Sequence, residues 1–286
     1  FIFSVYSVFE SMFTSWKRMD FSALISIARS FLLLLLVIII EKLTGGVFEI
    51  IVCYFISFLG SFLISLVIVK RSFVLPSFKR VSVMGLMRHA KVATPYLMAS
   101  MLSIILFKID HIMISRMSGD VQLGLYGSAY TLFEIIIAFF PMMIMRSSFP
   151  VLCDKYHHDR PGMIDLYNKL LKVFLLFGLP ISAGIFLLGN EIVIVLFGRE
   201  YLDAGILMSV LGVSIWVFFL TNLMGWTIVA INKQVLVMIS IMIAMVVNIV
   251  LNLILIPKMG ALGSAYATLV CELMQLLFMT MVIRKY

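Results

Sequence analysis

The chain has 286 residues, of which 63% are hydrophobic and 13% are charged, and it carries a formal net charge of +8. A soluble domain of this length needs far more polar side chains to cover its surface, so the composition excludes a water-soluble fold. The basic excess does not indicate a nucleic-acid partner. The Lys and Arg residues are concentrated in every second loop between the apolar stretches, and they form no patch with interleaved aromatic residues.

Eight mostly apolar stretches of 20 or more residues follow one another along the chain, joined by short polar segments. A hydrocarbon core of about 30 Å takes about 20 helical residues, so each stretch can span a bilayer. The runs are continuous and lack the alternation of barrel strands, which predicts an all-α fold, a polytopic transmembrane helical bundle in the lipid bilayer. The predicted spans are Phe21–Ile40, Val47–Val69, Val92–Ile114, Leu123–Met145, Leu170–Gly189, Ala204–Ile231, Gln234–Ile256 and Ala261–Ile283.

The ends of these spans suggest a division of the chain into three parts. Phe1–Trp16 is apolar but too short to span, and we interpret it as the end of a helix whose start precedes the chain, so the bundle is N-terminally incomplete. The joint before the third complete span is long and basic, and its Pro76 breaks any continuous helix. We expect residues 1–70 to be the remainder of an N-terminal lobe, 71–91 a cytoplasmic inter-lobe linker, and 92–286 a C-terminal lobe of six transmembrane helices.

The basic residues segregate onto alternate joints. Only Lys42, Arg116, Arg199 and Lys258 lie on one side of the predicted membrane. By the positive-inside rule the richer side faces the cytoplasm, which predicts a multi-pass protein of the plasma (inner) membrane with a cytoplasmic C-terminus. The sixteen residues on that side are Lys17, Arg18, Lys70, Arg71, Lys79, Arg80, Arg88, Lys91, Arg146, Lys155, Arg160, Lys169, Lys172, Lys233, Arg284 and Lys285.

Several polar or short segments have a structural interpretation without a chemical role. The apolar run Ile192–Phe197 is too short to span, so we expect it in the outer membrane interface. Gly260 and Gly263 predict a tight outer turn, and Gly263 also a close approach of the last helix to a neighbour. We place His157 and His158 in a solvated cytoplasmic joint. No Cys or His shows metal-ligand spacing, so we predict no metal and no cofactor.

Polar side chains at membrane depth are the candidates for function. An uncompensated charge there costs about 2.5 to 3.5 kcal/mol on insertion scales, so such residues should face a cavity or a partner. We predict no catalytic residue. The substrate-cavity candidates are Arg29, Lys108, Asp110, Glu134, Glu272, Asn248 and Asn252.

Two pairs of these candidates have alternatives that the sequence leaves open. Arg29 can bind a diphosphate through its guanidinium fork, or close an ion pair with Glu134 at the membrane midplane. Lys108 and Asp110 lie two residues apart and point to nearly opposite sides of their helix, so at least one can reach the headgroups instead of a cavity.

The remaining candidates can serve helix packing as well as transport. Glu272 with Gln275 at i, i+3 and Asn248 with Asn252 at i, i+4 each share a helix face, and either pair can form a polar contact between helices. The three carboxylates among the candidates motivate the hypothesis that transport is coupled to a proton or sodium gradient.

Four segments carry a resemblance to a known family. In chain order they are Phe107–Tyr126, Phe149–Leu152, Asn190–Ala204 and Asn248–Thr268. Together they resemble the C-terminal lobe of Wzx-type oligosaccharide flippases, within the multidrug/oligosaccharidyl-lipid/polysaccharide (MOP) exporter superfamily. The resemblance covers essentially the whole chain and implies a MATE-like architecture of two six-helix lobes. The complete spans would then be helices five to twelve, with three helices and most of a fourth absent.

The resemblance implies a flippase that moves a polyprenyl-diphosphate-linked glycan across the membrane for cell-surface polysaccharide or O-antigen biosynthesis. The polymerase and glycosyltransferases of the same pathway would be its partners. One alternative is a MATE-type multidrug or cation antiporter of the same superfamily, whose cavity would be acidic and aromatic. Another is a membrane-embedded enzyme or polymerase of the polysaccharide pathway, but no catalytic motif or large outer loop is present, so we expect no enzymatic activity.

Overall fold

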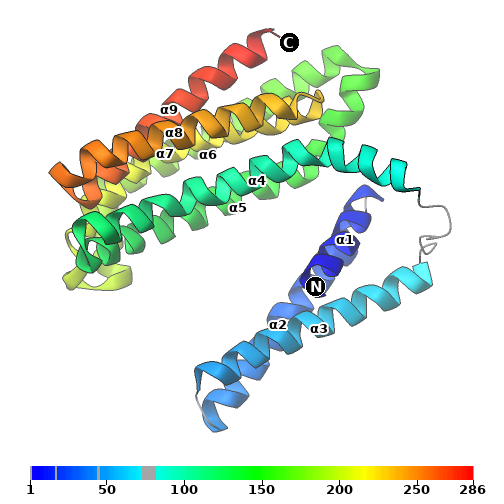
Figure 1. Ribbon diagram of the computed structural model, residues 1–286, viewed down its shortest axis with the longest axis horizontal. Coiled ribbons are helices and arrows are strands. Elements are labelled where there is room, and N and C mark those ends of the chain that lie inside the picture. The colour runs from blue at the N-terminus through cyan, green and yellow to red at the C-terminus, as the bar shows by residue number, and fades with distance from the viewer. Residues whose placement is uncertain (1, 17, 44–45, 73–81, 286) are drawn as a thin grey trace. The chain divides into compact units, whose positions relative to one another are not determined.

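The computed structural model describes residues 2–16, 18–43, 46–72 and 82–285, and contacts divide the chain into two compact units, Phe1–Gly85 and Leu86–Tyr286. Eight helices of the described residues are long and apolar enough to cross a membrane, in agreement with the predicted all-α membrane fold (Figure 1). The first unit contains α1 (Ile2–Ser15), α2 (Met19–Leu43) and α3 (Val47–Ser72). The second contains all but the first three residues of α4 (Val83–Ser118), together with α5 (Asp120–His158), α6 (Arg160–Phe197), η2 (Arg199–Tyr201), α7 (Ala204–Ala230), α8 (Gln234–Met259) and α9 (Ala261–Lys285).

In the first unit, α1, α2 and α3 contact one another around a small apolar core. Buried serine hydroxyls of α3 are satisfied within the helix, since Ser61 donates to the carbonyl of Ser57 and Ser65 to that of Ser61, each at 2.8 Å. Such back-bonded serines bury no unpaired hydroxyl and allow close helix packing. The buried core residues are Tyr6, Phe13, Ile25 and Val69.

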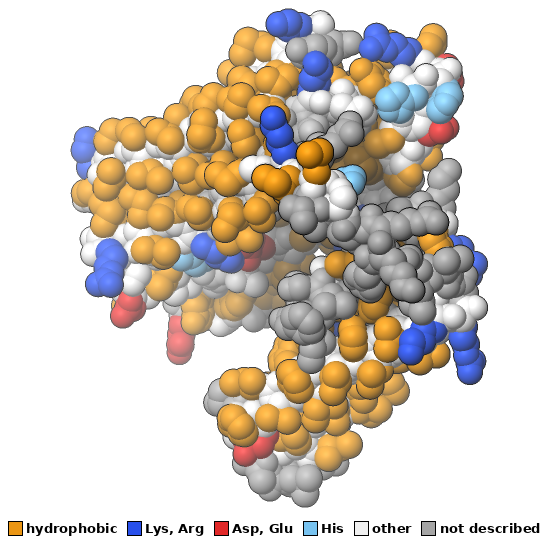
Figure 2. All heavy atoms as spheres, turned by 45° about the vertical axis from the view of Figure 1, so that its right-hand side comes forward, with side chains coloured by type: hydrophobic (Ala, Val, Ile, Leu, Met, Phe, Trp, Pro, Cys, Tyr) orange, Lys and Arg blue, Asp and Glu red, His pale blue; other side chains and the backbone are white. Residues whose placement is uncertain are grey.

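Helix α7 is the centre of the second unit. It contacts α5, α6, α8 and α9, and 67% of its most apolar window is buried inside the protein. A helix that is apolar on every side is expected at the core of a bundle. Figure 2 shows the complementary surface, where hydrophobic side chains cover most of the visible helix flanks and charged side chains gather mostly toward the helix ends.

Glycines set the closest helix approaches in the second unit. A side chain at Gly205 on α7 would collide with Asn190 on α6, and a Cβ at Gly212 would lie 2.7 Å from the Ile185 side chain. The predicted tight turn is also confirmed, because Gly260 adopts a φ of +60° and a Cβ at Gly263 would lie 2.5 Å from the carbonyl oxygen of Leu255 on α8. Its place on the outer side of the membrane stays a prediction. Glycine is therefore required at these contacts for steric reasons.

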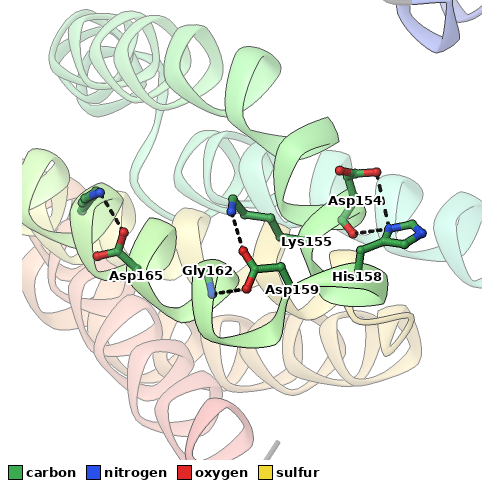
Figure 3. Close-up of polar contacts among 7 residues, drawn as sticks. Asp154, Lys155, His158, Asp159, Gly162 and Asp165 are labelled. Atoms are coloured by element: carbon green, nitrogen blue, oxygen red, sulfur yellow. Dashed lines mark hydrogen bonds and ion pairs between the residues drawn. The ribbon is translucent and has the colours of Figure 1, made fainter.

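The boundary between α5 and α6 differs from the prediction. His157 and His158 are exposed but belong to the last turn of α5, so the expected polar joint between the two helices is reduced to Asp159. Figure 3 shows the cause. The Asp159 carboxylate accepts hydrogen bonds from Lys155 Nζ and from the backbone N–H of Gly162, both at 2.9 Å. The Lys155 ammonium, with the Gly162 N–H, lowers the pKa of Asp159. Ion pairs at i, i+4 and this N-cap stabilise helix ends that hydropathy alone does not detect.

Two other helices extend into segments that the sequence analysis placed outside the spans. The run Ile192–Phe197 continues α6 after a kink at Leu188, whose φ and ψ are −109° and 17°, and its position in the membrane interface stays a prediction. Helix α4 begins at Val83, so the last part of the predicted linker 71–91 is helical. Pro76 lies outside the described residues.

Candidate functional site

A buried polar cluster joins four helices of the second unit around Asp110, which is 1% exposed. Its carboxylate on α4 accepts hydrogen bonds from the Asn252 amide on α8 at 2.6 Å, from the Tyr126 hydroxyl on α5 at 2.9 Å and from the Thr268 hydroxyl on α9 at 3.0 Å. A carboxylate is costly to bury unless such donors occupy its lone pairs. The Asp110 cluster therefore ties α4 to the rest of its unit.

The asparagine pair belongs to the same cluster. The Asn252 amide also donates to Asn248 Oδ1 at 2.9 Å, and both side chains are almost fully buried, which confirms that they share a helix face. The contact of Asn252 with Asp110 is the polar helix–helix contact that the sequence offered as the structural alternative. A role of the pair in transport stays a prediction.

Lys108 and Glu134 form an ion pair between α4 and α5. Lys108 Nζ lies 2.7 Å from Glu134 Oε1, and the side chains are 55% and 37% exposed. Glu134 thus finds its cation on the neighbouring helix, so pairing with Arg29 is not needed to compensate its charge. The contrast between exposed Lys108 and buried Asp110 confirms that the two residues point to different sides of α4.

A cavity of about 530 Å³ lies within the second unit, between α4, α5, α7, α8 and α9. Among the described residues that line it, Glu272 is the only carboxylate and none is Lys or Arg. Its aromatic lining residues are Tyr96, Phe107, Phe149, Phe218 and Trp226. Its polar lining residues are Ser100, Ser103, Thr221, Asn222, Gln234, Glu272 and Gln275. We call this space the lobe cavity.

Glu272 lies between the lobe cavity and the Asp110 cluster. It is 7% exposed and accepts a hydrogen bond from the Thr221 hydroxyl at 3.3 Å. With Gln275 it also lines a chamber of about 20 Å³, whose wall includes Asp110 and Asn248. A polar chamber of this size holds about one water molecule. A single water can therefore lie between the two carboxylates.

Arg29 lies in the first unit, on α2. Its guanidinium is 4.9 Å from the Phe58 ring centroid and 5.8 Å from that of Tyr6, both in the same unit. Cation–π contacts of this kind compensate a charge without an anion. The proposed role of Arg29 in binding a diphosphate stays a prediction.

The candidate residues do not form a metal centre. In the described segments no group of three or more His, Cys, Asp and Glu side chains could hold a metal ion. The cysteines Cys53, Cys153 and Cys271 are free, and only the first and the last of them are buried. The polar groups found here instead offer hydrogen bonds and one carboxylate to a ligand.

Sequence reasoning missed several residues of the site. Tyr126 and Thr268 complete the Asp110 cluster, and Asn222 and Trp226 line the lobe cavity. Hydroxyls and aromatic rings are common in membrane helices, so their presence in a span carried no signal. Asn222 is the exception, since an amide deep in a predicted span meets the same criterion that selected Asn248.

Comparison with known proteins gives one family match. A family model described as "Polysaccharide biosynthesis protein" matches residues 1–206. By sequence, none of the curated proteins matches the chain.

Solved structures share the fold at low sequence identity. A multidrug resistance MATE family transporter of the MOP superfamily, in an outward-facing conformation, is 14% identical with a TM-score of 0.83, covering 99% of this chain and 66% of that chain. The lipid II flippase MurJ, in an inward closed conformation, is 15% identical with a TM-score of 0.70, covering 99% and 60%. A Vibrio cholerae MATE transporter is 11% identical with a TM-score of 0.80, covering 98% and 66%.

These matches confirm the predicted MOP-type fold and the resemblance stated from the sequence. The chain spans less than two thirds of the length of the solved structures it matches, 66% of the first and 60% of the second. At identities of 11 to 15% the likeness concerns the fold alone.

Proposed function

Because the chain belongs to the polysaccharide biosynthesis protein family, we propose that it is a flippase that moves a polyprenyl-diphosphate-linked oligosaccharide from the cytoplasmic to the outer leaflet. The family match over residues 1–206 is the observation that carries this proposal. The MOP fold supports it, since the solved structures of that fold include a lipid II flippase. The family and these neighbours are transporters and not enzymes, so the alternative of a polysaccharide-pathway enzyme is not retained.

The physical requirement for this function is a hydrated space at membrane depth. A glycan and a diphosphate are too polar for hydrocarbon, whereas a polyprenyl tail is stable in it. The lobe cavity supplies polar side chains at that depth, and alternating access would move one lobe against the other. The pathway's polymerase and glycosyltransferases are the expected partners, on opposite sides of the membrane.

Orientation is part of the proposal. The distribution of Lys and Arg favours a cytoplasmic C-terminus. A reporter fused after Tyr286 tests it, because alkaline phosphatase is active only outside the cytoplasm and green fluorescent protein is fluorescent only inside. We expect fluorescence without phosphatase activity, and the reverse result would invert the topology and the direction of transport.

Coupling to a proton or sodium gradient assigns a role to Asp110, Glu134 and Glu272. Glu134 is neutralised by Lys108, whereas Asp110 and Glu272 have only neutral donors among their described hydrogen-bond partners. Asp110 and Glu272 are therefore the better coupling groups. Replacing all three with amides should abolish the dependence of transport on an imposed gradient. Gradient-driven transport that persists in this variant would exclude the coupling role.

A second function is favoured by one observation. The lobe cavity is aromatic and contains one carboxylate and no described Lys or Arg, which is the pattern expected of a MATE-type antiporter for organic cations. Depletion of the protein in its host separates the two functions. A flippase predicts lipid-linked oligosaccharide that accumulates facing the cytoplasm and is cleared on complementation. An antiporter predicts normal surface polysaccharide and increased sensitivity to cationic dyes.

A further inference from the structure

Two amide side chains, Asn222 and Gln234, line the lobe cavity. In each of them the side-chain oxygen has almost no accessible surface and forms no hydrogen bond with any described residue. Buried amide groups are nearly always paired in folded proteins, because an unpaired one costs about 1 to 3 kcal/mol. The oxygen and nitrogen of an amide can exchange places by a flip, and a hydroxyl can pair with either, since it both donates and accepts. The cavity thus offers amide groups, which can donate or accept, to a ligand with several hydroxyl groups.

Trp226 adds a flat apolar surface to the same cavity. It lines the cavity next to Phe149, and the two rings meet edge to face with centroids 4.9 Å apart. A large ring held in this way has one preferred orientation and offers its surface at a low entropic cost. Polar groups around an aromatic platform match the amphipathic shape of a pyranose, which has C–H groups on its faces and hydroxyls on its edge.

The charge of the cavity restricts which part of the substrate fits. Glu272 is its only described carboxylate, and the ammonium of Lys108 is engaged by Glu134 at 2.7 Å. A diphosphate or a uronic acid would bring negative charge beside Glu272 without a described cation in the wall to pair with it. Binding of an anion there would leave an uncompensated charge in a medium of low polarity.

We propose that the lobe cavity binds one sugar unit of the substrate glycan, and that this unit carries no negative charge. Its hydroxyls pair with Asn222 and Glu272, and one face of its ring packs on Trp226, which lies one helical turn from Asn222. The volume of about 530 Å³ is within the range of roughly 300 to 1,000 Å³ found for small-molecule sites. This inference rests on the proposed flippase function and adds a specificity, in which the diphosphate binds elsewhere.

Trp226 is a suitable reporter for the test. The chain has three Trp residues, so the variant Trp16→Phe/Trp216→Phe leaves Trp226 as the only one. In the purified protein, the fluorescence of Trp226 is titrated with methyl glucoside, methyl glucosaminide and methyl glucuronoside. We expect saturable changes with the neutral or the amino sugar, and at least tenfold weaker binding of the uronoside. Asn222→Ala should weaken sugar binding about tenfold.

A steric plug provides a matched control. A Cβ at Gly225, which lines the cavity, would meet only Met279, at 3.8 Å, so the side chain of Gly225→Leu extends into the open space. Gly184 on α6 has no atom within 4 Å of its Cβ position and does not line the cavity. Gly225→Leu should abolish the fluorescence response, while Gly184→Leu should retain it at an equal thermal midpoint.

Three results would overturn the inference. These are uronoside binding as tight as that of the neutral sugar, equal responses in the two leucine variants, and no saturable response to any sugar in folded protein. If oligosaccharide translocation persists in any of these cases, only the sugar subsite is wrong. If tetraphenylphosphonium binds in place of the sugars and no translocation occurs, the flippase function itself fails.

Discussion

Asp110 on α4 accepts a 2.6 Å hydrogen bond from the side-chain amide of Asn252 on α8, 142 positions further along the chain. This contact therefore joins the first helix of the second unit to its last hairpin, and it places a carboxylate where neighbouring helices must stay in register.

The side chains of Asp110 and Asn252 should be energetically coupled. We expect Asn252→Ala to lower the free energy of unfolding by about 1 to 3 kcal/mol, because it leaves one oxygen of a buried carboxylate without its donor. The double variant with Asp110→Asn should show a coupling energy of about 0.5 to 3 kcal/mol. Reversible unfolding in detergent measures both. Effects that add within about 0.5 kcal/mol would show that the two side chains act independently.

The ion pair of Lys108 and Glu134 should behave differently in single and double variants. Lys108→Met or Glu134→Gln alone leaves one charge at membrane depth, at an insertion cost of about 2.5 to 3.5 kcal/mol before it is reduced by exposure to water or headgroups. Lys108→Met/Glu134→Gln removes both charges and should recover most of the yield of folded protein. The yield in membranes measures this, and a double variant worse than either single variant would contradict it.

Packing of α6 against α7 should depend on Gly205. Gly205→Ala places a methyl group against Asn190 and should cost about 1 to 3 kcal/mol through overpacking. Gly184→Ala is the matched control, since nothing lies within 4 Å and alanine is favoured over glycine in a helix by about 1 kcal/mol. Thermal midpoints should fall in the first variant and stay or rise in the second. Equal midpoints would mean that the two helices do not approach as described.

Asp159 should make the stability of the N-terminus of α6 depend on pH. The pKa of its carboxyl is lowered by Lys155 and by the Gly162 N–H, so its stabilising effect is complete above its ordinary pKa and is lost as the pH falls through the lowered value. Hydrogen exchange of the Gly162 amide should be faster in Asp159→Ala than in wild type at neutral pH, and the difference should disappear in strong acid. A difference that persists when the carboxyl is protonated would exclude an electrostatic cap.

The membrane helices could be predicted because a single property, a run of about 20 apolar residues, determines them. That Asn248 and Asn252 share a helix face could also be predicted, since helix periodicity fixes it. The extension of α5 to His158 was not, because it depends on i, i+4 ion pairs and a cap outside the hydrocarbon region. Hydropathy reports on the bilayer and not on the helix that continues beyond it.

The site itself was only partly predictable. Depth and charge selected Asp110, Glu134 and Glu272, but the partner of each depends on which helices are neighbours. Tyr126 and Thr268 lie 16 and 158 positions from Asp110, and no local pattern in the sequence predicts that they contact it. The pairing of Glu134 with Lys108 has the same origin. Helix packing decides such contacts, and the spacing of residues along one helix does not specify it.

Translocation in proteoliposomes tests the central claim most directly. The protein is reconstituted with a fluorescent polyprenyl-diphosphate-linked oligosaccharide in both leaflets, and an added membrane-impermeant quencher reports how much reaches the outer leaflet. We predict that quenching proceeds to near completion with wild-type protein and stays near half in protein-free liposomes, while an organic cation is not accumulated. Quenching that stays near half with folded wild-type protein, together with gradient-driven uptake of the organic cation, would contradict the account.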